Sequence, residues 1–224
     1  MAAPAKLQIY LTPFTVNSRK VLAGLDLIGT DYDLHIIDFE NDEHKSEAYL
    51  RINPHGTVPT AKHGDLIITE SNAILMYAAD LSKNGSPAYP TDLKLRAEAN
   101  RWLLWECSVW FQTNYVFLVE NVFNPLNEFP IDQAKIEAEL PNWHKNAAIL
   151  DARLAETGGW MLKGDGPSIV DVAIGAPMQL AEMQKLPIDE YPNLKRWFSD
   201  LRALPSWVKT QKAIDEALTE DGGD

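Results

Sequence analysis

Cysteine is almost absent from this chain of 224 residues, because Cys107 is the only one. A single cysteine excludes an internal disulfide, a CxxC redox motif and a cysteine zinc site, and we expect no bound metal. Basic residues are also scarce, since 20 Lys and Arg face 32 Asp and Glu and leave a formal net charge of −12. Nucleic acids and anionic membranes are bound by basic surfaces, so neither is an expected partner.

Long apolar runs are missing as well. No stretch approaches the roughly 18 apolar residues that a membrane-spanning helix needs. Residues 1–6 carry no apolar signal core and lead directly into a strand pattern. With the single cysteine, these absences predict a protein of the reduced, cytosolic compartment. The length allows one large domain or two small ones with a real core.

The first third of the chain has a mixed α/β pattern. Apolar periodicity predicts strands and helices in the order βαβ-α-ββα, which is typical of a small sheet with helices on both faces. The predicted strands are 6–11, 32–37, 58–62 and 66–68, and the predicted helices are 18–28, 44–52 and 70–81. Gly29 is the expected C-cap of the first helix.

The remainder of the chain has a helical pattern throughout. Residues 82–91 are rich in turn formers, including two prolines, and indicate a linker. The predicted helices beyond it are 92–119, 133–156, 168–184, 191–203 and 205–218. We therefore expect an α/β domain over residues 1–82, a linker over 83–91 and an all-helical domain over 92–224.

Two local motifs stand out. The first runs through Asn53-Pro-His-Gly-Thr-Val-Pro59, then Gly64-Asp65, then Glu70-Ser71 at the start of a helix. A helix N-terminus offers unpaired N–H groups that can bind a carboxylate, so this stretch indicates a binding site for a small anionic peptide. The second motif, Ser168-Ile-Val-Asp171, predicts a capping box, which we interpret as structural.

These motifs, in this order, resemble the cytosolic glutathione transferase superfamily, and the resemblance covers essentially the whole chain. Residues 44–46 and 50–53 are most similar to the theta-like group. The resemblance implies a thioredoxin-like N-terminal domain, an all-α C-terminal helical bundle, glutathione as co-substrate and a homodimer.

The resemblance also implies a role for each end of the tripeptide. A cis Val58-Pro59 bond would expose the backbone of Val58 to the cysteinyl unit. Ser71 would hold the γ-glutamyl carboxylate, and Glu70 the neighbouring ammonium. The other implied contacts are His44 with Lys45 at the glycine carboxylate, and Thr57 as a weaker contact.

The thiolate donor is expected in the turn after the first strand. In serine-type members a serine stands four residues before an arginine, and the same spacing from Arg19 gives Thr15. Bacterial nu-class and fungal Ure2p-like members carry Thr-x-Asn-x-x-Lys, which Thr15, Asn17 and Lys20 match. Thr15 is therefore the first candidate, Asn17 the second and Ser18 the third, whereas cysteine-type chemistry has no residue here.

The second substrate is expected between the two domains, in an apolar pocket formed by Phe14, Trp110 and Phe111. The leading interpretation is a glutathione S-transferase that conjugates glutathione to small hydrophobic electrophiles. One alternative is glutathione-dependent reduction of disulfides or hydroperoxides. Another is a non-catalytic interaction module, against which the presence of Glu70, Ser71 and His44 argues.

Overall fold

The computed structural model describes residues 6–82 and 86–220. Linker positions 83–85 and the chain ends 1–5 and 221–224, to which the predicted domains extended, lie outside the described residues. The first part contains one four-stranded sheet with the strand order β2-β1-β3-β4. Its strands are β1 (Leu7–Leu11), β2 (Tyr32–Ile36), β3 (Thr60–His63) and β4 (Leu66–Ile68). β1 pairs in parallel with β2 and antiparallel with β3, and β3 pairs antiparallel with β4.

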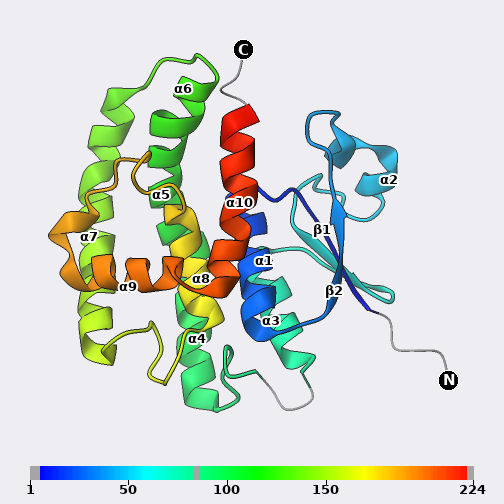
Figure 1. Ribbon diagram of the computed structural model, residues 1–224, viewed down its shortest axis with the longest axis horizontal. Coiled ribbons are helices and arrows are strands. Elements are labelled where there is room, and N and C mark those ends of the chain that lie inside the picture. Colours follow the sequence, from blue (N-terminus) through cyan, green and yellow to red (C-terminus); the bar gives the residue numbers. More distant parts are fainter. Residues whose placement is uncertain (1–5, 83–85, 221–224) are drawn as a thin grey trace.

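Helices cover both faces of this sheet, as the sequence predicts. Helices α1 (Val16–Ile28) and α3 (Ser71–Asp80) pack together on one face, and α2 (Glu47–Leu50) lies on the other (Figure 1). Gly29 ends α1 in the left-handed conformation with φ 78°, which confirms it as the C-cap. Gly24 lets the two helices approach closely, because a Cβ there would meet the Leu75 side chain at 2.5 Å.

The second part is all-helical and is built around one long helical run. This run comprises α4 (Leu93–Trp105), a π-helical segment (Glu106–Trp110), α5 (Phe111–Leu118), a second π-helical segment (Val119–Phe123) and α6 (Asn124–Leu126). It continues beyond residue 119, where the sequence prediction ended it. The other helices are α7 (Gln133–Thr157), α8 (Ile169–Gly175), α9 (Pro192–Arg202) and α10 (Pro205–Glu220).

Helix α8 is much shorter than predicted. The sequence pattern suggested a helix over residues 168–184, but α8 ends at Gly175 and a 3₁₀ turn follows over Ala176–Met178. Pro177 lies in that turn, and a proline has no N–H to continue the helical hydrogen bonding. The Ser168–Asp171 capping box at the start of α8 is confirmed.

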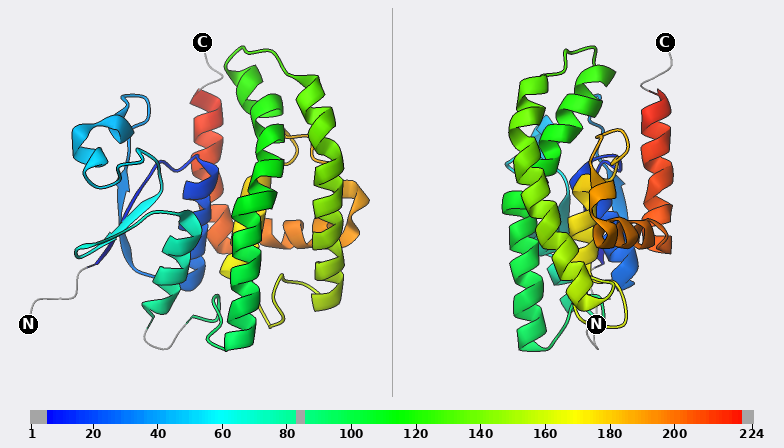
Figure 2. Two further views of the ribbon diagram at one scale, coloured as in Figure 1. Left: turned by 180° about the vertical axis from the view of Figure 1, so that it is seen from behind. Right: turned by 90° about the vertical axis from the view of Figure 1, so that its left-hand side faces the viewer.

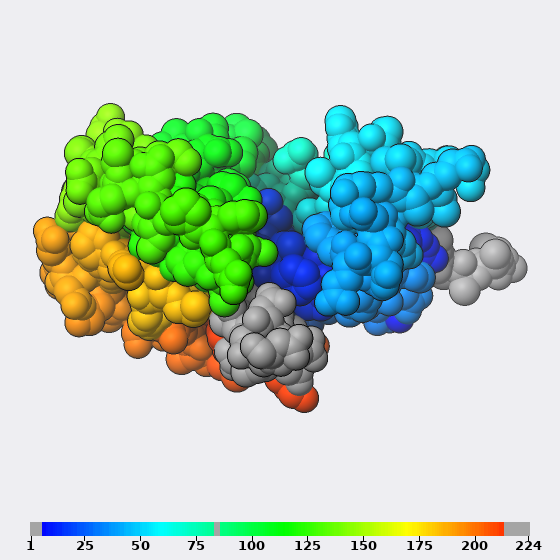
Figure 3. Space-filling model, turned by 90° about the horizontal axis from the view of Figure 1, so that it is seen from above, coloured from blue at the N-terminus to red at the C-terminus, as the bar shows by residue number. Residues whose placement is uncertain are grey.

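The two parts pack against each other along α1, which contacts α8 and α10 of the helical part. Figure 2 shows α1 and α3 lying between the sheet and the helical bundle. Viewed from above, the dark blue N-terminal segment forms the floor of a groove between the two parts (Figure 3). The fold is therefore the expected α/β domain followed by a helical bundle. Within the described residues, no helix is both long and apolar enough to cross a membrane.

Candidate functional site

Two adjoining cavities lie between the α/β part and the helical part. The polar cavity, of about 670 Å³, contains Glu70 and Ser71 in its lining. The aromatic cavity, of about 620 Å³, contains Phe14 and Tyr115. The residues that line both cavities are Asn17, Thr57, Val58 and Phe111. A ligand that filled both would pass these four side chains.

Two buried side chains, Asn53 and Tyr49, hold the turn before β3 in place through hydrogen bonds. Asn53 Nδ2 donates to the Thr57 carbonyl oxygen at 2.8 Å and to Thr60 Oγ1 at 3.0 Å. The Tyr49 hydroxyl donates to the same carbonyl at 2.7 Å, and burial raises the pKa of Tyr49. The Val58-Pro59 bond in this turn is cis, as the family resemblance implied. Val58 is thus held at the edge shared by both cavities.

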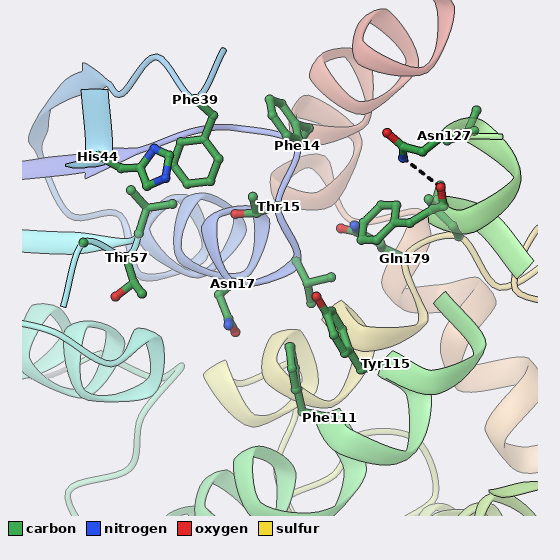
Figure 4. A pocket seen from close by; sticks show the side chains of 16 residues that line it. Phe14, Thr15, Asn17, Phe39, His44, Thr57, Phe111, Tyr115, Asn127 and Gln179 are labelled. Atoms are coloured by element: carbon green, nitrogen blue, oxygen red, sulfur yellow. Dashed lines mark hydrogen bonds between the residues drawn. The ribbon is translucent and has the colours of Figure 1, made fainter. Parts of the chain in front are cut away.

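His44 reaches the aromatic cavity from the segment before α2. Its ring lies 4.2 Å from that of Phe39, centroid to centroid, and Figure 4 shows the two rings side by side. Gly56 permits this arrangement, because its φ is 61° and a Cβ there would lie 3.2 Å from the His44 carbonyl oxygen. Lys45, the predicted companion of His44, instead points to solvent and pairs with Asp42 at 2.7 Å.

The N-terminus of α3 opens into the polar cavity. Glu70 is the N-cap residue with φ 67°, an uncommon conformation for a residue with a side chain, and no side chain caps the helix. The first-turn N–H groups of an uncapped helix have no partner within the helix. Glu70 and Ser71 both line the cavity at this point. The arrangement can hold an anion against the helix end and a cation beside Glu70.

The three thiolate-donor candidates occupy different environments at the start of α1. The Thr15 hydroxyl caps the helix and donates to Ser18 Oγ at 2.7 Å. Ser18 is fully buried and lines neither cavity. Asn17 extends into the space between Thr57 and Phe111 (Figure 4). Its Oδ1 accepts from the Ser71 hydroxyl at 3.2 Å, while its Nδ2 forms no hydrogen bond within the described residues.

A buried ion pair lies beneath Ser71. Lys20 Nζ on α1 is 2.8 Å from Glu106 Oε2 in the first π-helical segment, and both side chains are almost completely buried. Lys20 Nζ also donates to Ser71 Oγ at 3.2 Å. Asn72 Nδ2 donates to the same Glu106 oxygen at 2.9 Å and to the Leu103 carbonyl oxygen at 2.8 Å. These contacts tie α1 and α3 to the helical part.

Aromatic side chains dominate the second cavity. Phe14 is 44% exposed at its rim, and Phe111 stacks on Tyr115 with ring centroids 5.4 Å apart. Figure 4 shows Phe14 facing Phe111 and Tyr115 from the opposite side of the cavity. Trp110, expected beside Phe111, is fully buried instead, and its Nε1 donates to the Ile174 carbonyl oxygen at 2.9 Å.

Cys107 lines the polar cavity but is poorly suited to act as a nucleophile. Burial and the negative charge of Glu106 raise the pKa of its thiol. Only the thiolate attacks well, so a raised pKa disfavours chemistry on this sulfur. Within the described ranges, no group of three or more His, Cys, Asp or Glu is arranged to hold a metal ion.

Several cavity residues have no clear signal in the sequence. Glu106 and Asn72 lie on helices whose patterns predict only packing, and their cavity positions depend on how the two parts dock. The π-helical segments rotate the side chains of the long helix relative to a regular α-helix, which a 3.6-residue period does not anticipate. Lys20 did carry a signal, as the third residue of the Thr-x-Asn-x-x-Lys pattern.

Both parts of the chain match known protein families. The family model for the glutathione S-transferase N-terminal domain matches residues 5–80, and that for the C-terminal domain matches residues 115–205. A probable glutathione S-transferase, GSTF2 of Oryza sativa subsp. japonica, is 30% identical over 213 residues, covering 92% of this chain and 95% of the relative. Glutathione S-transferase theta-2B of Homo sapiens is 33% identical over 180 residues, covering 80% of this chain and 69% of the relative.

Solved structures of glutathione S-transferases also superpose on nearly the whole chain. A glutathione S-transferase-I bound with lactoylglutathione superposes with a TM-score of 0.79 at 28% identity, covering 94% of this chain and 99% of the other. Glutathione S-transferase I from mais, in complex with an atrazine glutathione conjugate, has a TM-score of 0.80 at 26% identity with the same coverage. The similarity thus extends over both parts of the chain.

Proposed function

This chain belongs to the cytosolic glutathione transferase superfamily, and we propose that it conjugates glutathione to small hydrophobic electrophiles. One observation carries the proposal: a polar cavity with an uncapped helix end adjoins an aromatic cavity, and the two share Asn17, Thr57, Val58 and Phe111. The two solved relatives described above bind lactoylglutathione and an atrazine glutathione conjugate, ligands that pair the tripeptide with a second group.

In this proposal the polar cavity holds the γ-glutamyl end of glutathione. The carboxylate lies on the N–H groups at the start of α3, beside Ser71, where the helix dipole favours a negative charge. Glu70 attracts the neighbouring ammonium. The backbone of Val58, exposed by the cis bond, pairs with the cysteinyl unit, while Thr57 and Pro59 border it. His44 receives the glycine carboxylate at the far side.

Asn17 is the preferred donor to the sulfur. Its Nδ2 has no hydrogen bond within the described residues, whereas the Thr15 hydroxyl is already engaged with Ser18. Lowering the thiol pKa by about two units requires roughly 2.7 kcal/mol of preferential thiolate stabilisation. A hydrogen bond to a charged group contributes about 1.5–3 kcal/mol, and the N-terminus of α1 adds a favourable potential. Thr15 is the second candidate.

The aromatic cavity receives the electrophile. Phe14, Phe111 and Tyr115 offer a largely apolar surface next to the expected sulfur position, so a flat hydrophobic compound fits better than a charged one. We further propose a homodimer formed across α4, on which Leu93 is 80% and Leu104 66% exposed. A single monomeric mass in sedimentation would contradict that part of the proposal.

A second reaction is favoured by one feature, the Thr15-x-Asn17-x-x-Lys20 pattern. Similarity to nu-class and Ure2p-like members suggests glutathione-dependent disulfide reduction in the same site. Turnover of an aryl halide and of a glutathione-coupled disulfide should be compared at equal glutathione concentration. The conjugation proposal expects kcat/KM to be higher for the aryl halide. A clear excess for the disulfide would replace it with reduction.

A further inference from the structure

We propose that Lys20 is a positioning residue that orients the amide of Asn17 through the hydroxyl of Ser71. The inference rests on the proposed glutathione site and assigns a role to an almost completely buried residue in the wall of its polar cavity. Lys20 Nζ lies 3.2 Å from Ser71 Oγ, and Ser71 Oγ lies 3.2 Å from Asn17 Oδ1. The three groups form one chain of hydrogen bonds from a buried cation to the edge shared by both cavities.

The direction of each hydrogen bond in this chain follows from the chemistry of its donors. An ammonium group has no acceptor, so Lys20 must donate to Ser71 Oγ. The Ser71 hydroxyl then has one hydrogen to give, and Asn17 Oδ1 is the acceptor within reach. The amide oxygen of Asn17 therefore faces Ser71, and its Nδ2 faces the cavity as a donor. A donor at that point stabilises a thiolate, whereas the amide oxygen would repel it.

Without Lys20, nothing would fix which of Ser71 and Asn17 donates in the hydrogen bond between them. A serine oxygen has two lone pairs and could accept from the amide as well, but the positive charge of Lys20 on the first lone pair disfavours a second donor there. If Ser71 no longer received a hydrogen bond from Lys20, Asn17 could turn over and donate its Nδ2 to Ser71. The amide oxygen would then face the sulfur. Chains of hydrogen bonds that begin at a charge also polarise each member, which strengthens Ser71 as a donor.

The buried pair is not explained by stability. Replacing a buried ion pair with apolar residues of similar size is often neutral or stabilising. Here Glu106 Oε1 and Asn72 Oδ1 are buried without a hydrogen-bond partner among the residues that the structure describes, which costs further stability. Glu106 and Asn72 serve instead to hold Lys20 in place, with Asn72 Nδ2 2.9 Å from the carboxylate oxygen that Lys20 contacts.

The test uses a variant that keeps the packing and removes the charges. Lys20→Met alone would leave Glu106 buried without a counterion and threaten folding, so it is combined with Glu106→Met. We expect the double variant to keep its resistance to urea. The bound glutathione thiol should have its pKa raised by about one pH unit, and glutathione should bind about threefold to tenfold more weakly. A matched control, Arg153→Met with Glu98→Met, removes an ion pair of 2.7 Å away from both cavities and should leave the thiol pKa unchanged.

A double-mutant cycle shows whether Lys20 acts through Ser71. In a Ser71→Ala background, Lys20→Met with Glu106→Met should raise the thiol pKa no further. The inference is overturned if the double variant keeps the thiol pKa of the unmutated protein, or if its effect is equally large in the Ser71→Ala background. If the unmutated protein fails to bind glutathione, the proposed function falls and this inference with it. If it binds glutathione and lowers the thiol pKa while the pair has no effect, only this inference fails.

Discussion

Ser71 on α3 donates its hydroxyl hydrogen to Asn17 Oδ1 on α1 at 3.2 Å. This bond joins the residue proposed to hold the carboxylate of glutathione to the residue proposed to activate its sulfur. Since Lys20 contacts Ser71 from below, both ends of the tripeptide site depend on one buried network. Binding and activation are therefore expected to respond together to changes in this network.

Ser71→Ala should weaken glutathione binding about threefold to tenfold while leaving the fold intact. The hydroxyl gives its one hydrogen to Asn17, which lines both cavities, so the variant loses that orientation while the backbone N–H groups of α3 remain to hold the carboxylate. Isothermal titration calorimetry measures the change. Ser199→Ala, on the exposed face of α9, is the matched control and should bind as the unmutated protein does. Equal affinities for the two variants would mean that the Ser71 hydroxyl takes no part in holding glutathione.

Asn17→Ala should raise the pKa of the bound thiol by about one pH unit or more. Thr15→Val, which removes the hydroxyl but keeps the shape, should have the smaller effect, because that hydroxyl already donates to Ser18 at 2.7 Å. Ultraviolet absorbance of the thiolate, followed against pH, gives both values. A larger effect of Thr15→Val would reverse the assignment and make Thr15 the donor.

Phe14→Ala should raise KM for a hydrophobic electrophile about threefold to tenfold and leave KM for glutathione within about twofold. Phe14 lines the aromatic cavity only, and burial of an aromatic ring against a ligand contributes a few kcal/mol at most. Steady-state kinetics with each substrate varied separately makes the comparison. Phe129→Ala, at a site that is 63% exposed and lines neither cavity, is the control. A change confined to glutathione would show that the cavities are assigned the wrong way round.

Asp171→Ala should lower the free energy of unfolding by about 3–5 kcal/mol. The Asp171 carboxylate accepts from the Met161 and Ser168 N–H groups and from Trp197 Nε1, each at 2.8 Å, and all three donors would be left buried without it. Urea denaturation followed by tryptophan fluorescence measures the loss. Asp189→Ala, whose side chain is 86% exposed, should change stability by less than about 1 kcal/mol. A small effect of Asp171→Ala would mean that water replaces the carboxylate.

The sequence predicted the local structure well where one residue type decides it. Gly29 ends α1 because a left-handed residue is needed there, and the Ser168–Asp171 box caps α8. The cis Val58-Pro59 bond could be expected only from the family resemblance, since most bonds before proline are trans. The turn that holds it depends on Asn53, a fully buried side chain bonded to residues four and seven positions further along the chain.

The sequence does not predict how the two parts of the chain pack against each other. Trp110 and Phe111 are neighbours, yet one is core and the other lines both cavities: successive helical side chains point about 100° apart, and the docking decides which direction meets the cavities. Arg19, which served as a spacing marker for Thr15, instead fixes α10: it donates to Thr210 Oγ1 at 3.0 Å and lies over the Trp207 ring. Contacts between residues almost two hundred positions apart have no local pattern.

One measurement tests the central claim most directly: an ultraviolet thiolate titration of glutathione bound to the unmutated protein. Free thiols titrate near pH 8.5. We expect the bound thiol to titrate about two pH units lower, because Asn17 Nδ2 and the N-terminus of α1 both favour the charged sulfur. Saturable binding of glutathione with a thiol that still titrates near 8.5 would contradict the account, since the site would then hold the tripeptide without activating it.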